Sequence, residues 1–377
     1  MTKKILITGG AGFIGSHLAD FLIESSNDEV TVLDCLDEQV HGKINNPPDY
    51  LNKNIKFILG SVNDQEEFEE VVKENEIIFH LAAKVGVGQS MYQIRDYVDN
   101  NILGMGNLLN ILVNSEHDVK KIVIASSNTV YGEGKASCAK CGIVFPKLRI
   151  LNQMKNKNWN IQCPKCEGRL KSLLTDENAL CNPSSIYALS KRVQEEMGLM
   201  ICKTYGIDIT ILRFFLVYGP RQALSNPYTG VFAIFCTRLL NGKSPIIFED
   251  GLQSRDFVNV KDICQALMLA MKSPVANGEI FNVGTGIPLT IKEVAENFVE
   301  KINPKLKPIY NQQYRVGDIR HCVADISKIK NKLGYDPKIS FDKGIEEYIN
   351  WIKKKEYKFQ DKTDEALAEL KEKGLLK

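Results

Sequence analysis

The sequence lacks three features that mark specialised classes of protein. Its 48 basic and 46 acidic side chains leave a net charge of only +2, so we expect no general polyanion-binding surface and no nucleic-acid partner. No apolar run approaches the length of a membrane span, so we expect no membrane partner. The first residues run into a glycine motif without a signal-peptide cleavage site, so we expect a cytoplasmic protein.

Ten cysteines stand out in a chain without a secretion signal, a context that favours reduced thiols. Two Cys-x-x-Cys pairs, Cys138/Cys141 and Cys163/Cys166, have nearly the spacing of a zinc ribbon. Four thiolates suit a closed, structural zinc site, with iron in the same cage or two regulatory disulfides as alternatives. The other six cysteines are expected to be small buried apolar residues. They are Cys35, Cys181, Cys202, Cys236, Cys264 and Cys322.

Short β-branched runs alternate with helix-like spacing through the first two-thirds of the chain, which predicts an α/β fold with a doubly wound parallel sheet. The expected strands are Ile5–Thr8, Val30–Asp34, Ile55–Leu59, Ile77–Leu81, Lys121–Ala125, Ile209–Arg213 and Ile280–Val283. The expected helices are Ile14–Glu24, Glu66–Lys73, Asn101–Asn114, Tyr187–Tyr205, Thr290–Lys301 and, after a charged linker, Thr363–Leu376. Lys135–Leu174 and Gly219–Tyr228 interrupt this alternation, and the second reads as a loop over a site.

A glycine motif, Gly9-Gly-Ala-Gly-Phe-Ile-Gly15, follows the first strand and opens a helix. Gly9 permits the tight turn, Gly12 lets the backbone approach a pyrophosphate, and Gly15 allows close packing of helix on strand. Asp34 ends the second strand at the distance expected of a ribose-hydroxyl acceptor, and its carboxylate favours NAD over NADP. The alternative is an ordinary glycine turn and a strand-end carboxylate.

Tyr187 and Lys191 lie four residues apart and therefore on one face of a helix. A nearby ammonium favours tyrosinate, so we expect a lowered pKa of Tyr187 that suits it to proton transfer. Ser127, at the end of the fifth expected strand, would supply a hydroxyl to hold the reacting oxygen. In isolation, an exposed Tyr/Lys pair on a helix is equally compatible with these residues.

Together, GGAGFIG, Asp34, HLAA (80–83), SSNTVYG (126–132), YALSK (187–191), RFFLVYGPR (213–221) and QSRDFV (253–258) resemble the extended short-chain dehydrogenases that act on nucleotide sugars. The resemblance spans roughly residues 3–350. It implies a catalytic set of Ser127, Tyr187 and Lys191, with Lys191 also holding the nicotinamide ribose.

The resemblance also implies two sets of binding residues. The cofactor set is Gly9, Gly12, Phe13, Ile14, Gly15, Asp34, Ser61, Val62, Leu81, Ala82, Ala83, Asn101, Tyr187 and Lys191. The substrate set is Lys84, Ser127, Asn128, Arg221, Asn226, Phe248, Arg255 and Arg315. Arg255 and Arg315 match positions that grip the diphosphate, with surface ion pairing as the alternative. Phe248 would stack on the base, unless it is a core residue.

Dehydratases of this family carry an Asp-Glu pair after the catalytic serine, whereas this chain has Asn128-Thr129. Elimination is therefore disfavoured, and the resemblance implies inversion of carbon 4 through a transient 4-keto sugar, with NAD retained. The run Gly219–Val231 and the cysteine insert further resemble the dTDP-L-rhamnose 4-epimerase branch. Leu216 and Ser61 depart from the family pattern, and Cys322 occupies a gating position. The alternatives are a UDP-hexose or UDP-N-acetylhexosamine 4-epimerase, and a non-catalytic dinucleotide-sensing protein.

This interpretation divides the chain into four parts. An NAD-binding Rossmann domain would take residues 1–134, 171–215 and 255–284, and an inserted zinc ribbon residues 135–170. A smaller C-terminal α/β substrate domain would take 216–254 and 285–355, and a tail helix 356–377. Met197 and Met200 look exposed on the helix Tyr187–Tyr205, so we expect a homodimer built on this helix and Asn101–Asn114.

Overall fold

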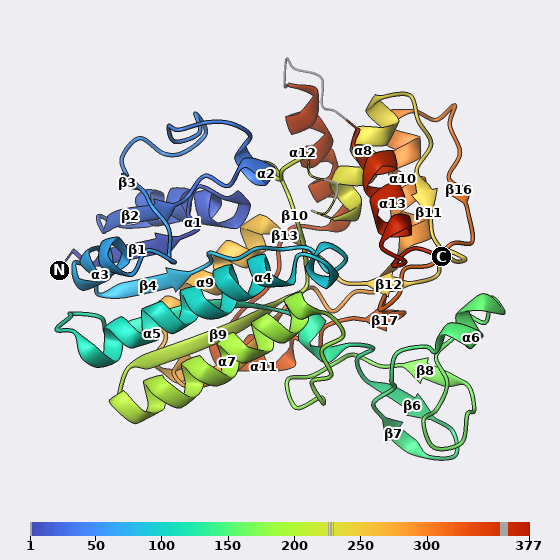
Figure 1. Cartoon of the computed structure of the whole chain (residues 1–377), viewed down its shortest axis with the longest axis horizontal. Helices are drawn as coiled ribbons and strands as arrows, with labels where there is room; N and C mark the ends of the chain where they lie inside the picture. The colour runs from blue at the N-terminus through green and yellow to red at the C-terminus, as the bar shows by residue number, and fades with distance from the viewer. Residues whose placement is uncertain (1, 225, 227, 229, 355–360) are drawn as a thin grey trace.

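Seven parallel strands form the central sheet of this computed structural model, which describes residues 2–224, 226, 228, 230–354 and 361–377. The strand order is β14-β9-β5-β4-β1-β2-β3 (Figure 1). The strands are β1 (Lys4–Thr8), β2 (Glu29–Asp34), β3 (Lys56–Leu59), β4 (Ile77–His80), β5 (Lys121–Ser127), β9 (Asp208–Phe214) and β14 (Glu279–Val283). All seven expected strands are therefore confirmed. The inner strands β1, β4, β5 and β9 are buried almost throughout, as their continuous apolar runs predict, whereas the edge strand β3 is partly exposed.

Helices cover both faces of this sheet. One face packs against α1 (Phe13–Ser25), α9 (Val260–Lys272) and α11 (Ser327–Leu333). The other packs against α3 (Gln65–Lys73), α5 (Gly104–Asn114) and α7 (Ile186–Tyr205), of which α5 and α7 lie side by side (Figure 1). The expected helix Asn101–Asn114 begins instead as a π-helical turn, Val98–Leu103, which carries the buried Asn101 side chain.

A second, smaller core lies on the C-terminal side of the sheet. Its aromatic centre is Phe232, which packs edge-to-face on Phe298 and on Tyr348. The elements around it are β10 (Leu216–Tyr218), α8 (Val231–Leu240), β11 (Ile246–Ile247), β12 (Ser254–Arg255), β13 (Phe257–Asn259), β15 (Leu289–Thr290), α10 (Ile291–Ile302), β16 (Ile309–Tyr310), β17 (His321–Cys322) and α12 (Phe341–Lys353). Among the helices of this core, only α10 was predicted from the sequence. The proposed domain limits stay predictions.

The cysteine insert forms its own antiparallel sheet, β7-β6-β8, and a short helix (Figure 1). These elements are β6 (Ala136–Cys138), β7 (Gly142–Val144), α6 (Leu151–Lys155) and β8 (Leu170–Ser172). Its small core holds Val144 and Ile161 beside two of the cysteines. β8 runs to Ser172, two residues beyond the expected end of the insert.

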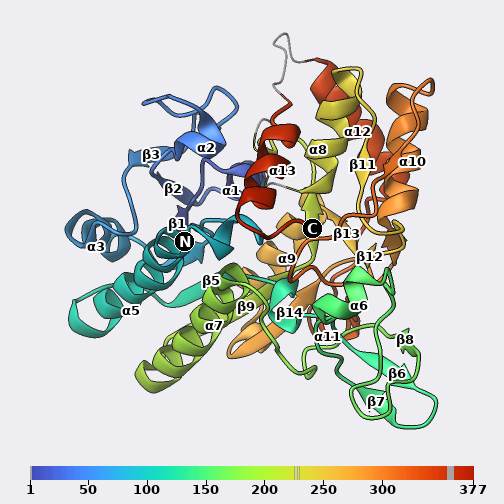
Figure 2. The same ribbon diagram turned by 45° about the vertical axis from the view of Figure 1, so that its right-hand side comes forward.

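The C-terminal tail crosses the molecule from one half to the other. Its helix α13 (Thr363–Glu372) lies beside α8, where its Asp364 binds Arg238 at 2.7 Å (Figure 2). The short helix α2 (Glu38–His41) follows β2. The expected continuation of this helix to Leu376 is wrong, because Leu375–Lys377 form backbone hydrogen bonds with Tyr314–Val316. Of the expected tail segment 356–377, residues 356–360 lie outside the described residues.

Short helical turns complete the structure. They are α4 (Ile94–Tyr97) and the 3-10 turns Gln89–Met91, Asn128–Tyr131 and Pro274–Ala276. Among the helices of the described part of the chain, none combines the length and the apolar character needed to span a bilayer.

Removal of Arg213 tests the buried ion pair that holds α7 on the sheet. Arg213 is fully buried and binds both carboxylate oxygens of Glu195, each at 2.7 Å. Arg213→Met leaves that carboxylate without its main partner, so we expect a loss of about 3–5 kcal/mol in the free energy of urea unfolding. Arg192→Met is the matched control, because Arg192 binds the same carboxylate at 2.9 Å from a partly exposed position. Its loss should stay below about 1 kcal/mol, and equal losses would contradict the prediction.

Candidate active site

A cavity of about 390 Å³ opens at the carboxyl ends of the central strands. Ligands bind at this edge of open parallel sheets, where the connections to the helices leave a crevice. Of the fourteen expected cofactor residues, Tyr187 and Lys191 line this cavity together with eleven others. They are Gly9, Gly12, Phe13, Ile14, Gly15, Asp34, Ser61, Val62, Leu81, Ala82 and Ala83.

The glycine motif has the geometry of a phosphate-binding turn. Gly9 has φ +68°, and a Cβ on it would lie 2.8 Å from the backbone of Ala82. A Cβ on Gly15 would lie 2.5 Å from the Gly9 carbonyl oxygen, so helix α1 packs too closely here for any side chain. At Gly12, by contrast, the space toward the cavity is open apart from that same carbonyl at 3.2 Å. The backbone at the N-terminus of α1 is therefore accessible to an anion.

Asp34 ends β2 with its carboxylate at the cavity. It accepts hydrogen bonds from the backbone N–H of Ala11 at 3.0 Å and of Leu36 at 2.9 Å. These bonds fix the carboxylate between the glycine turn and the segment after β2. Its residual acceptor positions suit a ribose diol, and its negative charge repels a 2′-phosphate. The residues present therefore fit NAD.

Asn101 does not line the cavity but supports it from behind. Its side chain accepts a hydrogen bond from the Lys84 backbone N–H at 2.8 Å and donates one to Ser190 Oγ at 2.9 Å. Lys84 itself lines the cavity, where its ammonium binds the Asp37 carboxylate at 2.7 Å. Asp37 and its neighbours Gln39 and His41 also line the cavity, although no sequence motif predicted them.

Ser127, Tyr187 and Lys191 meet in this cavity although the insert separates them in the sequence. Ser127 is the last residue of β5, and Tyr187 and Lys191 lie in the first two turns of α7. The Ser185 side chain caps this helix through the backbone N–H of Ala188. The end of β5 and the start of α7 lie at the same edge of the sheet, and this brings the three side chains together.

The pKa shifts of Tyr187 and Lys191 differ from the expectation. Burial raises the pKa of Tyr187, and only its hydrogen bond with Ser127 acts in the opposite direction. Burial also lowers the pKa of Lys191 to about 7, against the effect of the Glu195 carboxylate. The Lys191 ammonium donates to the Ala125 carbonyl at 2.9 Å, so desolvation outweighs the expected mutual stabilisation of tyrosinate and ammonium.

The residues after Ser127 bring no carboxylate toward it. Thr129 donates to Ser127 Oγ from its hydroxyl at 3.0 Å and from its backbone N–H at 3.2 Å. Asn128 is buried and turns to the Cys322 thiol, away from the lining of the cavity. The side chains at these two positions therefore offer hydrogen bonds but no general acid or base.

The remaining substrate candidates fall into two groups. Asn226 lines the cavity, and Gln39 donates to its side-chain oxygen at 3.1 Å. Arg221, expected at the substrate, lies outside that lining, binds Asp20 at 2.7 Å and stacks over the Tyr50 ring. Phe248, Arg255 and Arg315 also lie outside the lining, on the C-terminal side.

These last three side chains form one cluster around Asp318. Arg315 binds the Asp318 carboxylate at 2.9 Å and lies over the Phe248 ring, 5.3 Å from its centroid. Arg255 is buried, lies 3.5 Å from the same carboxylate and donates to the carbonyls of Ile319 and Arg320. Burial acts to raise the pKa of Asp318, but Arg315 and Arg255 lower it below its ordinary value. Arg255, Arg315 and Phe248 therefore lie together, as expected, and the Asp318 carboxylate binds the two arginines.

Behind this cluster lies a buried charge network that the sequence analysis missed. Arg149 and Arg320 bind the Glu249 carboxylate at 2.7 and 2.9 Å, and Arg320 also binds Asp250. Burial raises the pKa of Glu133 to about 7 even though Arg149 lies 3.5 Å away. Apart from the arginines themselves, no local pattern in the sequence signals a network drawn from such distant segments.

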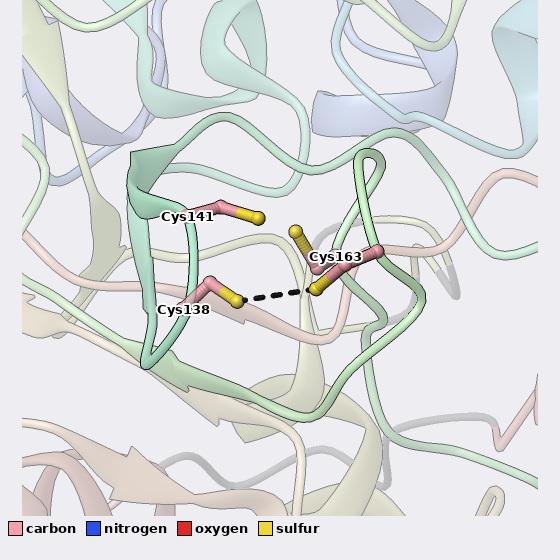
Figure 3. Close-up of side chains that lie close together, drawn as sticks. Cys138, Cys141 and Cys163 are labelled. Atoms are coloured by element: carbon pink, nitrogen blue, oxygen red, sulfur yellow. Dashed lines mark hydrogen bonds between the residues drawn. The ribbon is translucent and has the colours of Figure 1, made fainter.

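The four cysteines of the insert form a cluster that could hold a metal ion. All four Sγ atoms lie within 4.8 Å of one another, and Figure 3 shows Cys138, Cys141 and Cys163 turned toward a common point. Tetrahedral zinc with bonds of about 2.3 Å needs sulfurs roughly 3.8 Å apart. Backbone N–H groups of Lys140 and Cys141 lower the pKa of Cys138 to about 6. The donor set therefore fits a tetrathiolate metal site.

The six other cysteines only partly match the expectation of buried thiols. Cys202, Cys236, Cys264 and Cys322 are buried, and burial raises the pKa of each. Cys35 is exposed and Cys181 is half-buried, so the expectation is wrong for Cys35. Cys35 lies directly after Asp34 at the strand end, where the chain leaves the core.

The chain is similar in sequence to a known protein family and to known enzymes. The family model described as GDP-mannose 4,6 dehydratase matches residues 6–140 and 166–348. A dTDP-L-rhamnose 4-epimerase from Burkholderia thailandensis is 32% identical over 353 residues, which cover 93% of this chain and 95% of that protein.

Two solved structures are also similar. The UDP-glucose 4-epimerase of Thermotoga maritima with UDP-glucose has a TM-score of 0.76 and 31% identity, covering 93% of this chain and 99% of that one. The UDP-glucuronic acid 4-epimerase of Bacillus cereus with UDP-glucuronic acid and NAD has a TM-score of 0.76 and 27% identity, with the same coverage.

The pH dependence of stability tests the burial of Lys191. Its pKa of about 7 in the folded protein lies far below the value of an unfolded chain. Between about pH 7 and pH 10, the unfolded chain holds a proton that the folded protein has lost, so stability rises with pH. Lys191→Met removes this contribution. In denaturant unfolding of coenzyme-free protein, wild type should gain stability relative to the variant above pH 7, and a constant difference from pH 6 to 9 would refute the shift.

Proposed function

The chain belongs to the GDP-mannose 4,6-dehydratase-like family of extended short-chain dehydrogenases/reductases, and from this premise we propose that it inverts carbon 4 of a nucleotide sugar, with dTDP-L-rhamnose as substrate and dTDP-6-deoxy-L-talose as product. Similar proteins include nucleotide-sugar 4-epimerases, one of them solved with NAD, and the enzyme is accordingly an isomerase. The cofactor and substrate residues assigned here are part of the proposal.

One observation carries this proposal. The Ser127, Tyr187 and Lys191 side chains share a single cavity with the glycine turn and Asp34. A proton-transfer group therefore faces the place where the residues present would hold NAD. Such a juxtaposition supports oxidation and reduction at one carbinol carbon, with no net change of redox state.

The roles of the chain's own residues follow from their positions. Ser127 holds the oxygen on carbon 4, and Tyr187 accepts its proton and later returns it. Lys191 is placed to hold the nicotinamide ribose, where its donors replace water. When bound, NAD would supply the hydride acceptor and donor that inversion at carbon 4 requires. The 4-keto sugar stays in the cavity between these two transfers, which requires that water be excluded.

The residues beside Ser127 separate epimerisation from dehydration. Removal of water between carbons 5 and 6 needs a general acid and a general base near the sugar. Asn128 and Thr129 supply neither, and the Thr129 side chain is already bound to Ser127. The family name therefore describes the fold of this enzyme better than its reaction.

The proposed base and sugar of the substrate are supported by other observations than the proposed reaction type. The dTDP-L-rhamnose proposal rests on the Burkholderia relative and on the Gly219–Val231 sequence. A UDP-hexose or UDP-N-acetylhexosamine 4-epimerase is the second candidate, favoured by the Thermotoga structure with UDP-glucose and by the small Cys322 beside Asn128. A catalytically silent dinucleotide sensor is the outcome if no nucleotide sugar turns over.

We also propose that the insert is a zinc ribbon with one structural zinc ion on Cys138, Cys141, Cys163 and Cys166. Four thiolates leave no open coordination position, so the metal would stabilise the fold and take no part in the reaction. The small core of the insert supports this role, since a module of this size rarely folds on hydrophobic burial alone.

A homodimer through α5 and α7 is a further proposal. Met200 and Leu189 are exposed on α7, and Leu103 is exposed in the π-helical turn that leads into α5, with 67%, 47% and 49% of their surface accessible. Met197, expected to be exposed as well, is half-buried and packs on the core. An apolar surface of this kind on two parallel neighbours fits a symmetric four-helix contact.

Turnover of a nucleotide-sugar panel tests the proposed reaction. Purified enzyme should interconvert dTDP-L-rhamnose and its C4 epimer without added coenzyme, as resolved by NMR. UDP-glucose and UDP-N-acetylglucosamine are the competing substrates, and preference for either would replace the dTDP-L-rhamnose proposal. Tyr187→Phe removes the proton acceptor, so its rate should fall by about 10²–10⁴-fold.

Tyr205→Phe is the matched control for this substitution. It removes a phenol oxygen from the same helix at an exposed position, so its rate should equal that of wild type. A near-normal rate for Tyr187→Phe, or no turnover of any sugar by wild type, would overturn the proposed function.

Native mass spectrometry tests the proposed metal and assembly together. The expected species is a dimer with one zinc ion per chain, and Cys163→Ser should lose the zinc but stay dimeric, because the ribbon lies away from α5 and α7 (Figure 1). A mass that corresponds to iron, to two disulfides or to a monomer would contradict the respective assignment.

A further inference from the structure

The cysteine insert reaches into the C-terminal side of the molecule through one arginine. The Arg149 side chain is 2% exposed, and its guanidinium binds Glu249 Oε2 at 2.7 Å. It also donates to the Asp318 carbonyl oxygen at 3.0 Å and to the Trp159 carbonyl oxygen at 3.1 Å. A buried guanidinium with three such acceptors holds its partners in a fixed geometry.

The partners of Arg149 are neighbours of the expected diphosphate-binding side chains. Asp318 presents its carbonyl to Arg149 and its carboxylate to Arg315 and Arg255. Glu249 directly follows Phe248, whose ring lies under Arg315. Arg149 therefore holds Asp318 and Glu249, which lie in the chain segments that carry Arg315 and Phe248.

A second contact from the insert reaches the same region. The rings of Trp159 and Tyr314 pack with centroids 6.0 Å apart, in a small cluster with Met154 of α6. Tyr314 directly precedes Arg315. The segment 314–318 is thus held by the insert at both ends, by packing of tilted rings at Tyr314 and by a hydrogen bond to the carbonyl of Asp318.

The insert is an addition to the family's common fold. The family model passes over residues 141–165, the stretch that contains Arg149, Trp159 and Cys163. The arginine cluster, by contrast, lies within the matched residues. The insert therefore contacts, and helps to hold, a segment that belongs to the family's common fold.

We propose that Arg149 is a positioning residue for the nucleotide-diphosphate subsite formed by Arg255, Arg315 and Phe248, and that a metal ion on the four cysteines keeps it in place. This rests on the proposed nucleotide-sugar activity. Metal occupancy then sets the affinity for the nucleotide sugar, while Ser127, Tyr187 and Lys191 keep their geometry on the central sheet.

Nucleotide binding by Arg149→Met tests this role. The probes are dTDP and UDP, whose dissociation constants are measured by calorimetry on the full-length holoenzyme. Loss of one partner from a buried charge network should weaken binding on the order of 30-fold. KM for the nucleotide sugar should rise by a similar factor with kcat within about threefold, since the catalytic set is untouched. Arg149→Lys keeps the charge without the planar fork and should recover only part of the affinity.

Arg169→Met is the matched control, because it removes an exposed arginine from the same insert. It should bind dTDP as wild type does. Circular dichroism and retained NAD identify any variant that fails to fold. If folded Arg149→Met binds dTDP and UDP with wild-type affinity, the positioning role is overturned, whereas the proposed epimerase activity is judged separately by turnover of wild type.

Metal removal tests the second half of the proposal. In a Trp351→Phe background, which leaves Trp159 as the single tryptophan, chelation should shift its fluorescence and weaken dTDP binding as much as Arg149→Met does. Added Zn²⁺ should reverse both effects. Chelation of Arg149→Met should weaken binding no further, because metal and arginine act on one step. Additive losses, or unchanged binding by chelated wild type, would overturn the link between metal and subsite.

Discussion

A single buried carboxylate, Glu195, holds the candidate catalytic helix against the sheet. It accepts hydrogen bonds from Ser126 of β5 at 2.6 Å and from Arg213 of β9 at 2.7 Å. Lys191 lies one turn earlier on the same helix and donates to the Ala125 carbonyl of β5. The helix is thus joined to two adjacent strands at the level of the candidate site. Because a buried carboxylate is costly without its cation, the position of α7 depends on the β5–β9 pairing.

This attachment explains how the family fold tolerates an insert between Ser127 and Tyr187. The strand end and the helix start are fixed by contacts within the sheet and its helices, so the chain between them needs only to return to the same edge. The insert uses that freedom to build a separate core around Val144 and Ile161 and to carry four thiols. Long loops cost little more closure entropy than short ones, so the burden is the stability of the module itself.

The sequence predicts those parts of the molecule that depend on local patterns. Continuous apolar runs predict all seven strands, and the glycine turn with Asp34 predicts the dinucleotide crevice, because each signal lies within a few residues. The helix α12 carries a 3.6-residue apolar pattern at Ile345, Tyr348, Ile349 and Ile352 that would have predicted it as well. The prediction of a lowered pKa for Tyr187 is wrong, because burial raises this pKa and spacing on a helix does not reveal burial.

Long-range charge pairing is what the sequence could not reveal. Arg149 and Glu249 read as surface residues by composition, because charged side chains are seldom buried without partners. Asp318 shows why their burial matters. It lies 3.5 Å from Arg255 and 2.9 Å from Arg315, so these two arginines are already in position for the diphosphate of the proposed substrate. The cost of ordering those side chains is then met during folding and not on binding, which favours affinity. The insert fixes the segment before and at Asp318, and the tail pairs with Tyr314 and Val316. Both additions restrain the segment that carries Arg315.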